Sequence, residues 1–172
     1  MADTKVANML GALAIVLADD LREAVNSALA TTGETAAAII MLGAHPGLTI
    51  GEVAEALSIS HSGAVRLIDR LERDGLVGKR PGADARTMLV ELSSEGMAQR
   101  KIALRKRGAV LDRAVSLLDA QDEELLGRTL DKLLRGLLTR PEHGYRYCRM
   151  CDEDKCVPTC CPVEDQWERL YA

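Results

Sequence analysis

Residues 48–96 constrain the fold of this chain more than any other part of the sequence. Apolar side chains recur at helical spacing over residues 50–57 and again over residues 64–71. Residues 58–60 form a short break between these two predicted helices, and Ser60 can cap the helix that follows. Gly75 then supplies a stop, because glycine commonly lies just past a helix end. The stretch therefore predicts two helices joined by a tight turn.

A basic hairpin follows the second helix. Residues 77–80 and 87–92 have the pattern of two short strands, and Pro81 and Gly82 open the loop between them. Asp84 is the one obvious counter-charge for the three cations that cluster on this hairpin, which are Lys79, Arg80 and Arg86. Helix, turn, helix and hairpin together predict a winged helix-turn-helix with a small two-stranded wing.

The outer face of the second helix is polar and mostly cationic. Serine and histidine side chains near its start can reach base edges in a DNA major groove, and arginine can bind guanine or phosphate. The alternative is a solvated face whose arginines pair with neighbouring carboxylates. The cationic wing favours nucleic acid. The candidate DNA-binding residues are Ser60, His61, Ser62, Arg66, Arg70, Lys79, Arg80 and Arg86.

Charge is distributed unevenly along the chain. The net charge of −4 argues, by itself, against a nucleic-acid binder. Residues 60–107, however, hold eleven Lys and Arg and six Asp and Glu, so this part is basic and the remainder is acidic. A local basic patch can still steer an acidic protein to a duplex. Within residues 100–107 the cations form either a second phosphate-facing patch or an exposed helix face, and we expect the exposed face.

The same stretch resembles the MarR family of bacterial transcription regulators. The resemblance is carried by DRLERDGLV at 69–77, by Asp84-Ala85-Arg86, and by VELSSEG at 90–96, where Ser93 stands for the family's usual threonine. It covers roughly residues 5–139. It implies that Arg86 enters a minor groove, that Asp84 holds the wing loop, and that the second helix lies in a major groove. The readers it implies are Ser60, His61, Ser62 and Arg66.

Long amphipathic helices flank the winged helix. Residues 3–30 and residues 93–118 carry helical apolar stripes, a second helix ends near Gly43, and residues 120–139 form a leucine-rich seam. A single winged helix cannot bury so many stripes, so we expect them to meet a second copy. The family resemblance likewise implies a two-fold dimer, whose half-site centres would lie about 10 base pairs apart.

The predicted fold is therefore mainly α, with three regions. Residues 1–30 and 93–140 form the helical dimerisation region, residues 31–92 the DNA-binding lobe, and residues 141–172 a cysteine-rich extension. The apolar run at residues 9–18 is too short to span a bilayer, and its stripe continues past Asp19 and Asp20, which disfavours a secretory signal. We expect a cytoplasmic protein without membrane partners.

All five cysteines lie between residues 148 and 161, which indicates chemistry rather than core packing. Four of them have the spacing C-x2-C-x4-C-x4-C, typical of a site that closes around one tetrahedral ion. These are Cys148, Cys151, Cys156 and Cys161, with Cys160 as an alternate for the fourth. Zinc is the favoured cofactor, an iron–sulfur cluster is second, and a thiol redox switch is third.

The sequence also bears on other classes of function. With three histidines and none in a catalytic motif, we expect no enzyme, and we expect His45 and His143 to be ordinary loop residues. A winged helix that binds protein instead of DNA is the alternative function. A small-molecule effector is possible, although one sequence reveals no pocket. The last residues, 164–172, can form a helix that docks through Trp167, Leu170 and Tyr171.

Overall fold

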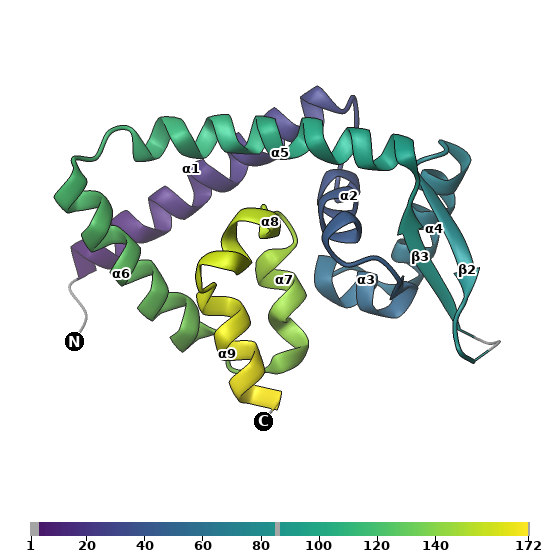
Figure 1. Ribbon diagram of the computed structural model, residues 1–172. Helices are drawn as coiled ribbons and strands as arrows, with labels where there is room; N and C mark the ends of the chain where they lie inside the picture. The colour runs from purple at the N-terminus through teal and green to yellow at the C-terminus, as the bar shows by residue number, and fades with distance from the viewer. Residues whose placement is uncertain (1–3, 85–86, 172) are drawn as a thin grey trace.

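The computed structural model describes residues 4–84 and 87–171. It confirms a mainly helical fold with one small antiparallel sheet (Figure 1). The elements before the extension are α1 (Thr4–Ala28), α2 (Thr35–Ala44), β1 (Leu48–Thr49), α3 (Ile50–Leu57), α4 (His61–Arg73), β2 (Val77–Pro81), β3 (Met88–Leu92), α5 (Ser94–Val115) and α6 (Ala120–Leu137).

Elements α2 to β3 form what we call the reader lobe. Its sheet has the order β1-β3-β2, and Val77 pairs with Leu92 while Leu48 pairs with Val90. The sequence predicted β2 and β3 but missed β1, whose two residues are too few to show alternation. The lobe is held by one apolar core that includes Ile39, Leu42, Val53, Leu57, Leu67, Ile68, Leu71 and Val90.

Side-chain caps fix the starts of three helices. The hydroxyl of Ser60 accepts a hydrogen bond from the Gly63 amide at 3.1 Å, so this serine begins α4. Ser93 accepts from the Gly96 amide at 3.0 Å and begins α5, and Asp119 begins α6. Each side chain satisfies an amide that a helix start otherwise leaves without a partner. The predicted cap at Ser60 is thereby confirmed.

The start of α5 is fixed tightly to the reader lobe. A Cβ atom at Gly96 would lie 2.1 Å from the carbonyl oxygen of Leu76, so only glycine permits this approach. The Ser93 hydroxyl donates to the carbonyl of Gly75 at 2.6 Å, and the Ser93 amide donates to the carbonyl of Leu76 at 2.9 Å. From this junction α5 runs away from the sheet and along α1, as Figure 1 shows.

The far ends of α1 and α6 expose apolar side chains. In the first half of α1, Val6, Met9 and Ile15 are each more than half exposed. In α6 no described residue is buried, and Leu125, Leu130, Leu133 and Leu137 are all exposed. Both helices lie on the side of the molecule opposite the wing (Figure 1). Among the described residues, no helix is both long and apolar enough to cross a bilayer.

The cysteine-rich extension is a set of short helical segments. They are η1 (Pro141–His143), α7 (Gly144–Cys148), α8 (Glu153–Cys156), η2 (Val157–Thr159) and α9 (Pro162–Tyr171). Figure 1 shows them between α6 and α3, beneath α5. As predicted, α9 docks through Trp167 and Leu170, but Tyr171 is 62% exposed and lies edge-on against the Trp167 ring. The extension therefore packs on the body of the protein.

Candidate nucleic-acid interface and cysteine cluster

The start of α4 presents its polar side chains to solvent. Ala64, Leu67, Ile68 and Leu71 bury the inner stripe of the helix, which leaves His61, Ser62 and Arg66 exposed on the outside. Ser60 is fixed as the cap, and its hydroxyl lies 3.2 Å from the Ser62 hydroxyl. Within the described part of the chain, the side chain of Arg66 makes no ion pair. A cation and three hydrogen-bonding groups are thus available at one helix end.

Arg70, two turns further along α4 than His61, has a different environment. Its Nη2 donates to the Thr35 hydroxyl at 2.8 Å, and Thr35 is buried at the start of α2. The Arg70 side chain thereby connects α4 to α2. Arg70 therefore has a structural role within the chain. Its contact with DNA stays a prediction from the sequence.

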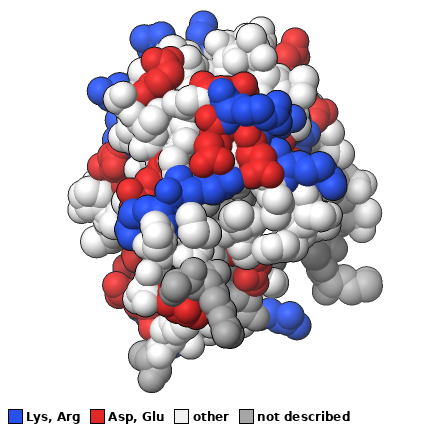
Figure 2. Space-filling view, turned by 90° about the vertical axis from the view of Figure 1, so that its right-hand side faces the viewer, with Lys and Arg blue, Asp and Glu red and all other residues white. Residues whose placement is uncertain are grey.

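The wing cations have more carboxylate partners than the sequence indicated. Lys79 Nζ lies 2.6 Å from Asp69 Oδ1 and 2.8 Å from Glu72 Oε2, and these hydrogen bonds raise the pKa of Lys79. Arg80 Nε lies 2.6 Å from Glu91 Oε1. The expectation that Asp84 alone could neutralise this hairpin is therefore wrong, because folding brings α4 and β3 carboxylates against it. Figure 2 shows acidic and basic side chains interleaved on this face.

The wing loop closes on itself through its backbone. The amide of Gly82 donates to the carbonyl of Thr87 at 2.8 Å, and the amide of Thr87 donates to the carbonyl of Asp84 at 2.9 Å. Arg86, the predicted minor-groove residue, lies outside the described residues.

Four of the five cysteines gather in one apolar cluster. Cys148 and Cys161 are buried, Cys151 and Cys156 are half-buried, and all four pack with Leu138 and Val163. The strongest interactions between thiols join Cys148 with Cys151 and Cys156 with Cys161, and weaker ones link Cys148 with Cys161 and Cys156 with Cys151. Cys160 is exposed, with a left-handed φ of 68°. This placement favours Cys161 over Cys160 as the fourth thiol.

The donor set fits a thiophilic metal, although the sulfur atoms are arranged as two pairs. All five cysteines are free thiols. Among residues 4–84 and 87–171, no group of three or more His, Cys, Asp or Glu is arranged to hold one ion. Zinc bound by four thiolates requires Zn–S distances of about 2.3 Å, so the two pairs would have to close on each other. They are already neighbours within one cluster, which makes such closure a local change.

One thiol in this cluster is more acidic than a free cysteine. Hydrogen bonding with Cys148 and the positive charge of Arg107 together lower the pKa of Cys151 to about 7. The same pairing raises the pKa of Cys148, whereas burial raises that of Cys156 to about 12. Arg107 Nε is buried and has no hydrogen-bond partner in the described structure.

Two residues that the sequence treated as ordinary are central to the placement of the extension. Arg100 was expected on an exposed helix face but is 4% exposed, and its Nη1 lies 2.9 Å from Asp154 Oδ2. That expectation is wrong because the Arg100 side chain packs against Gly43 and Ile40 of α2 before it reaches the extension. His45 was expected to be a plain loop residue, but its Nε2 lies 2.8 Å from Glu153 Oε2. A pairing across so many residues leaves no signal in a local pattern.

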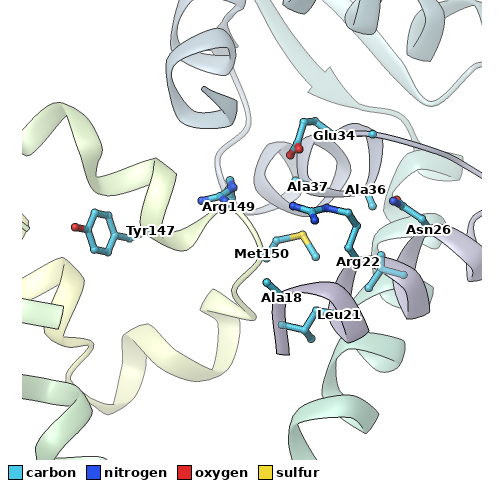
Figure 3. Close-up of a pocket in the computed structure, with 12 residues that line it drawn as sticks. Ala18, Leu21, Arg22, Asn26, Glu34, Ala36, Ala37, Tyr147, Arg149 and Met150 are labelled. Carbon is cyan, nitrogen blue, oxygen red and sulfur yellow. The ribbon is translucent and has the colours of Figure 1, made fainter. Parts of the chain in front are cut away.

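A cavity of about 210 Å³ lies where the extension meets α1 and α2. Its lining includes Arg22, Glu34 and Arg149 together with apolar side chains. Figure 3 shows Met150 projecting from the extension toward Ala18 and Leu21 of α1. The sequence could not predict this cavity, because its walls come from three separate regions of the chain.

Comparison with known proteins agrees with this architecture. Residues 31–87 match the sequence model described as MarR family. The MarR family protein Rv2887 of Mycobacterium tuberculosis is 27% identical, with a TM-score of 0.59 over 77% of this chain and 96% of that chain. MepR of Staphylococcus aureus, a transcription regulator of the multidrug efflux pump MepA, is 21% identical, with a TM-score of 0.65 over 76% and 97%. No curated protein matches the chain.

A structure of a MepR mutant bound to an oligodeoxyribonucleotide is similar as well. It is 22% identical, with a TM-score of 0.56 over 78% of this chain and 99% of that chain. The fold is therefore that of the MarR winged helix-turn-helix structures. These proteins are matched over nearly their whole length, whereas more than a fifth of this chain has no counterpart in them.

Proposed function

We propose that this chain, which has the fold of MarR-family regulators and matches that family over its winged helix, is a DNA-binding transcription regulator. The observation that carries the proposal is the exposed start of α4, where His61, Ser62 and Arg66 stand free on a helix fixed by its buried stripe. Such a helix end can enter a major groove, while the hairpin beside it contacts the backbone or the minor groove.

Ion pairing on the wing does not oppose this proposal. The carboxylates paired with Lys79 and Arg80 are 38–50% exposed, and exposed pairs contribute only about 0–1 kcal/mol. A DNA phosphate can therefore replace a carboxylate at small cost. The pairs hold Lys79 against the carboxylates of α4 and Arg80 against Glu91 of β3.

The protein is proposed to act as a homodimer. The apolar faces of α1 and α6 stay exposed in one chain, and a soluble chain that exposes so many leucines usually covers them with a partner. Both helices lie away from the wing, so a second copy would leave the two reader lobes free. Two-fold symmetry then predicts a pseudo-palindromic DNA site with half-site centres about 10 base pairs apart.

For the extension we propose a metal centre held by Cys148, Cys151, Cys156 and Cys161. Support comes from the gathering of these four thiols, with Cys160 outside the cluster. Zinc is the favoured ion, because a short segment without a core of its own needs a cross-link to stabilise it. Zinc bound by four thiolates provides such a cross-link without redox chemistry. An iron–sulfur cluster ranks second and a thiol redox switch third.

DNA selection tests the proposed function directly. The full chain is incubated with a random duplex library at low salt, and bound sequences are enriched and read. We expect a pseudo-palindrome, and we expect affinity for it to fall steeply with salt. Arg66→Ala should weaken binding at least fivefold, corresponding to about 1 kcal/mol or more for a lost base or phosphate contact. Arg128→Ala on α6, which removes another exposed cation far from the reader lobe, is the control.

If no sequence is enriched and binding is absent even at low salt, the proposal fails. The pairing of Lys79 and Arg80 with carboxylates favours the alternative in that case, a winged helix that binds protein. Equal losses for Arg66→Ala and Arg128→Ala would show that the contact is general charge attraction and that α4 is not the reading element.

A further inference from the structure

The segment between Cys148 and Cys156 contacts the reader lobe and the dimerisation helices at the same time. Met150 packs against the core of the reader lobe and also against the smaller cluster of Val25, Ala36, Ile40 and Ala103, which joins α1, α2 and α5. One side chain between two cysteines therefore lies at the junction of both regions.

Two polar side-chain contacts reinforce this position, and both start from the same turn of the extension. Glu153, whose side chain is 11% exposed, pairs with His45 at the end of α2. Asp154 pairs with Arg100, whose Nε also donates to the carbonyl of Ile40 at 3.2 Å. Arg100 thereby connects α5, α2 and the extension in one contact. These bonds fix the extension to the reader lobe from the side opposite the wing.

The other end of the extension is attached to α6. Arg135 pairs with Asp165 of α9 at 2.8 Å, and the hydroxyl of Tyr147 donates to the carbonyl of Leu137 at 2.9 Å. The extension is thus attached to the reader lobe at one end. At its other end it is attached to α6, the helix with an exposed apolar face. Figure 1 shows it filling the space between them.

The part of the extension around the contact segment has little regular secondary structure to hold its shape. Its helix α8 has four residues and η2 has three, and helices this short do not form in isolation. Of the four clustered cysteines, Cys148 precedes the contact segment, Cys151 lies within it, and the other two follow Asp154. Bonds from these thiolates to a single metal would fix the segment where hydrogen bonds cannot.

From these contacts we infer that the cysteine cluster is a regulatory metal site, which takes a thiophilic metal and couples its occupancy to the position of the reader lobe. The inference rests on the proposed DNA-binding function. Arg107 contributes to the same site: four thiolates around Zn²⁺ carry a net charge of about −2, and a guanidinium with a free buried Nε beside Cys151 can offset it.

The site itself is tested by metal content. Protein purified without oxygen is assayed for zinc, iron and sulfide, and its absorption spectrum is recorded. We expect about one zinc per chain and a colourless protein. Iron with sulfide and a brown colour would support the same four-thiolate site holding a cluster. Cys161→Ser should lose the metal and Cys160→Ser should keep it, whereas metal loss in both variants, or no stoichiometric metal in the parent, overturns the site.

Coupling is tested on the full chain, as purified, stripped with a chelator under reducing conditions, and reloaded with zinc alone. Amide hydrogen exchange in α2 and α3 should be at least fivefold faster in the stripped protein, and affinity for the selected DNA should change by at least fivefold. Both effects should reverse on reloading. Unchanged exchange and unchanged affinity in a fully stripped protein overturn the coupling.

A variant separates metal binding from its transmission. Met150→Ala combined with Glu153→Ala removes contacts to the reader lobe while leaving every cysteine in place. It should bind the metal but show no dependence of exchange or affinity on it. Lys155→Ala lies in the same segment with its side chain 85% exposed, and it should behave as the parent does. Because hydrogen exchange needs no DNA, a protein that binds no DNA but still shows metal-dependent exchange refutes the proposed function and not the coupling.

Discussion

The ion pair between Arg100 and Asp154 permits a prediction whose direction is not obvious. The two partners are buried unequally, since the side chain of Arg100 is 5% exposed and that of Asp154 is 69% exposed. Removing the exposed carboxylate leaves a guanidinium inside the protein without its counter-charge. Removing the buried guanidinium instead releases a carboxylate that water solvates at once. Asp154→Asn should therefore destabilise the protein more than Arg100→Met does.

The magnitudes follow from that asymmetry. Breaking a fully buried pair from one side costs about 3–5 kcal/mol, and solvent screening at Asp154 reduces this to about 2 kcal/mol for Asp154→Asn. In Arg100→Met the apolar stem is kept beside Gly43, and the loss is the hydrogen bond to the Ile40 carbonyl, about 1 kcal/mol. Because the double variant no longer contains an unpaired charge, its loss should be close to that of Arg100→Met alone.

Urea denaturation at one fixed protein concentration measures these losses, since the stability of the proposed dimer would depend on protein concentration. With a slope of about 2 kcal/mol per molar urea, the midpoint should fall by about 1 M for Asp154→Asn and about 0.5 M for Arg100→Met. The reasoning is refuted if Asp154→Asn is as stable as the parent, or if Arg100→Met is the more destabilised variant. A double variant less stable than both single variants would also contradict it.

Three further predictions concern separate parts of the chain. Leu133→Glu, which places a charge on the exposed apolar face of α6, should shift the protein from dimer to monomer in light scattering at micromolar concentration, and an unchanged mass would contradict the proposed interface. Arg86→Ala should weaken DNA binding and lower the slope of log affinity against log salt by about 1, whereas an unchanged slope and affinity would remove this residue from the interface. The pKa of Lys79 is raised by Asp69 and Glu72, so the folded state holds this proton more tightly than the unfolded state does. Its contribution to stability should be complete below about pH 10 and disappear as the pH rises further, and Lys79→Met should remove that part of the pH dependence.

The reader lobe could be predicted from the sequence because its signals are local. The apolar spacing in α3 and α4, the capping serines and the turn residues of the hairpin each act within a few residues of one another. Strand β1 was missed for the opposite reason. Leu48 and Thr49 become a strand only because β3, some forty residues later, offers a free edge to pair with.

The electrostatics of the wing could not be predicted in the same way. Lys79 and Asp69 lie ten residues apart, and their separation of 2.6 Å depends on the hairpin folding back along α4. The sequence showed which residues were charged but not which would face one another. The reader residues His61, Ser62 and Arg66 do stand exposed on α4, while their contacts with DNA stay a prediction.

The cysteine site was predictable in its residues but not in its surroundings. Spacing alone selected four cysteines and kept Cys160 as an alternate for Cys161, and the fold distinguishes these two by burying Cys161 and exposing Cys160. The partners Arg100, Arg107 and His45 carried no signal, because each meets the extension only through tertiary packing. Zinc, iron–sulfur and redox chemistry remain predictions that metal analysis will separate.

The close approach of Gly96 to Leu76 has a mechanical consequence. Since α5 is fixed to the base of the wing at this point, the helix and the hairpin must rotate as one rigid body. With 22 residues, α5 is about 33 Å long. If α5 rotates by about 5° about its C-terminal end, its N-terminal end and the wing attached there move by about 3 Å. This is close to the 3.4 Å rise of one base pair. Very small movements between two copies of the chain would be enough to carry each wing from one base step to the next.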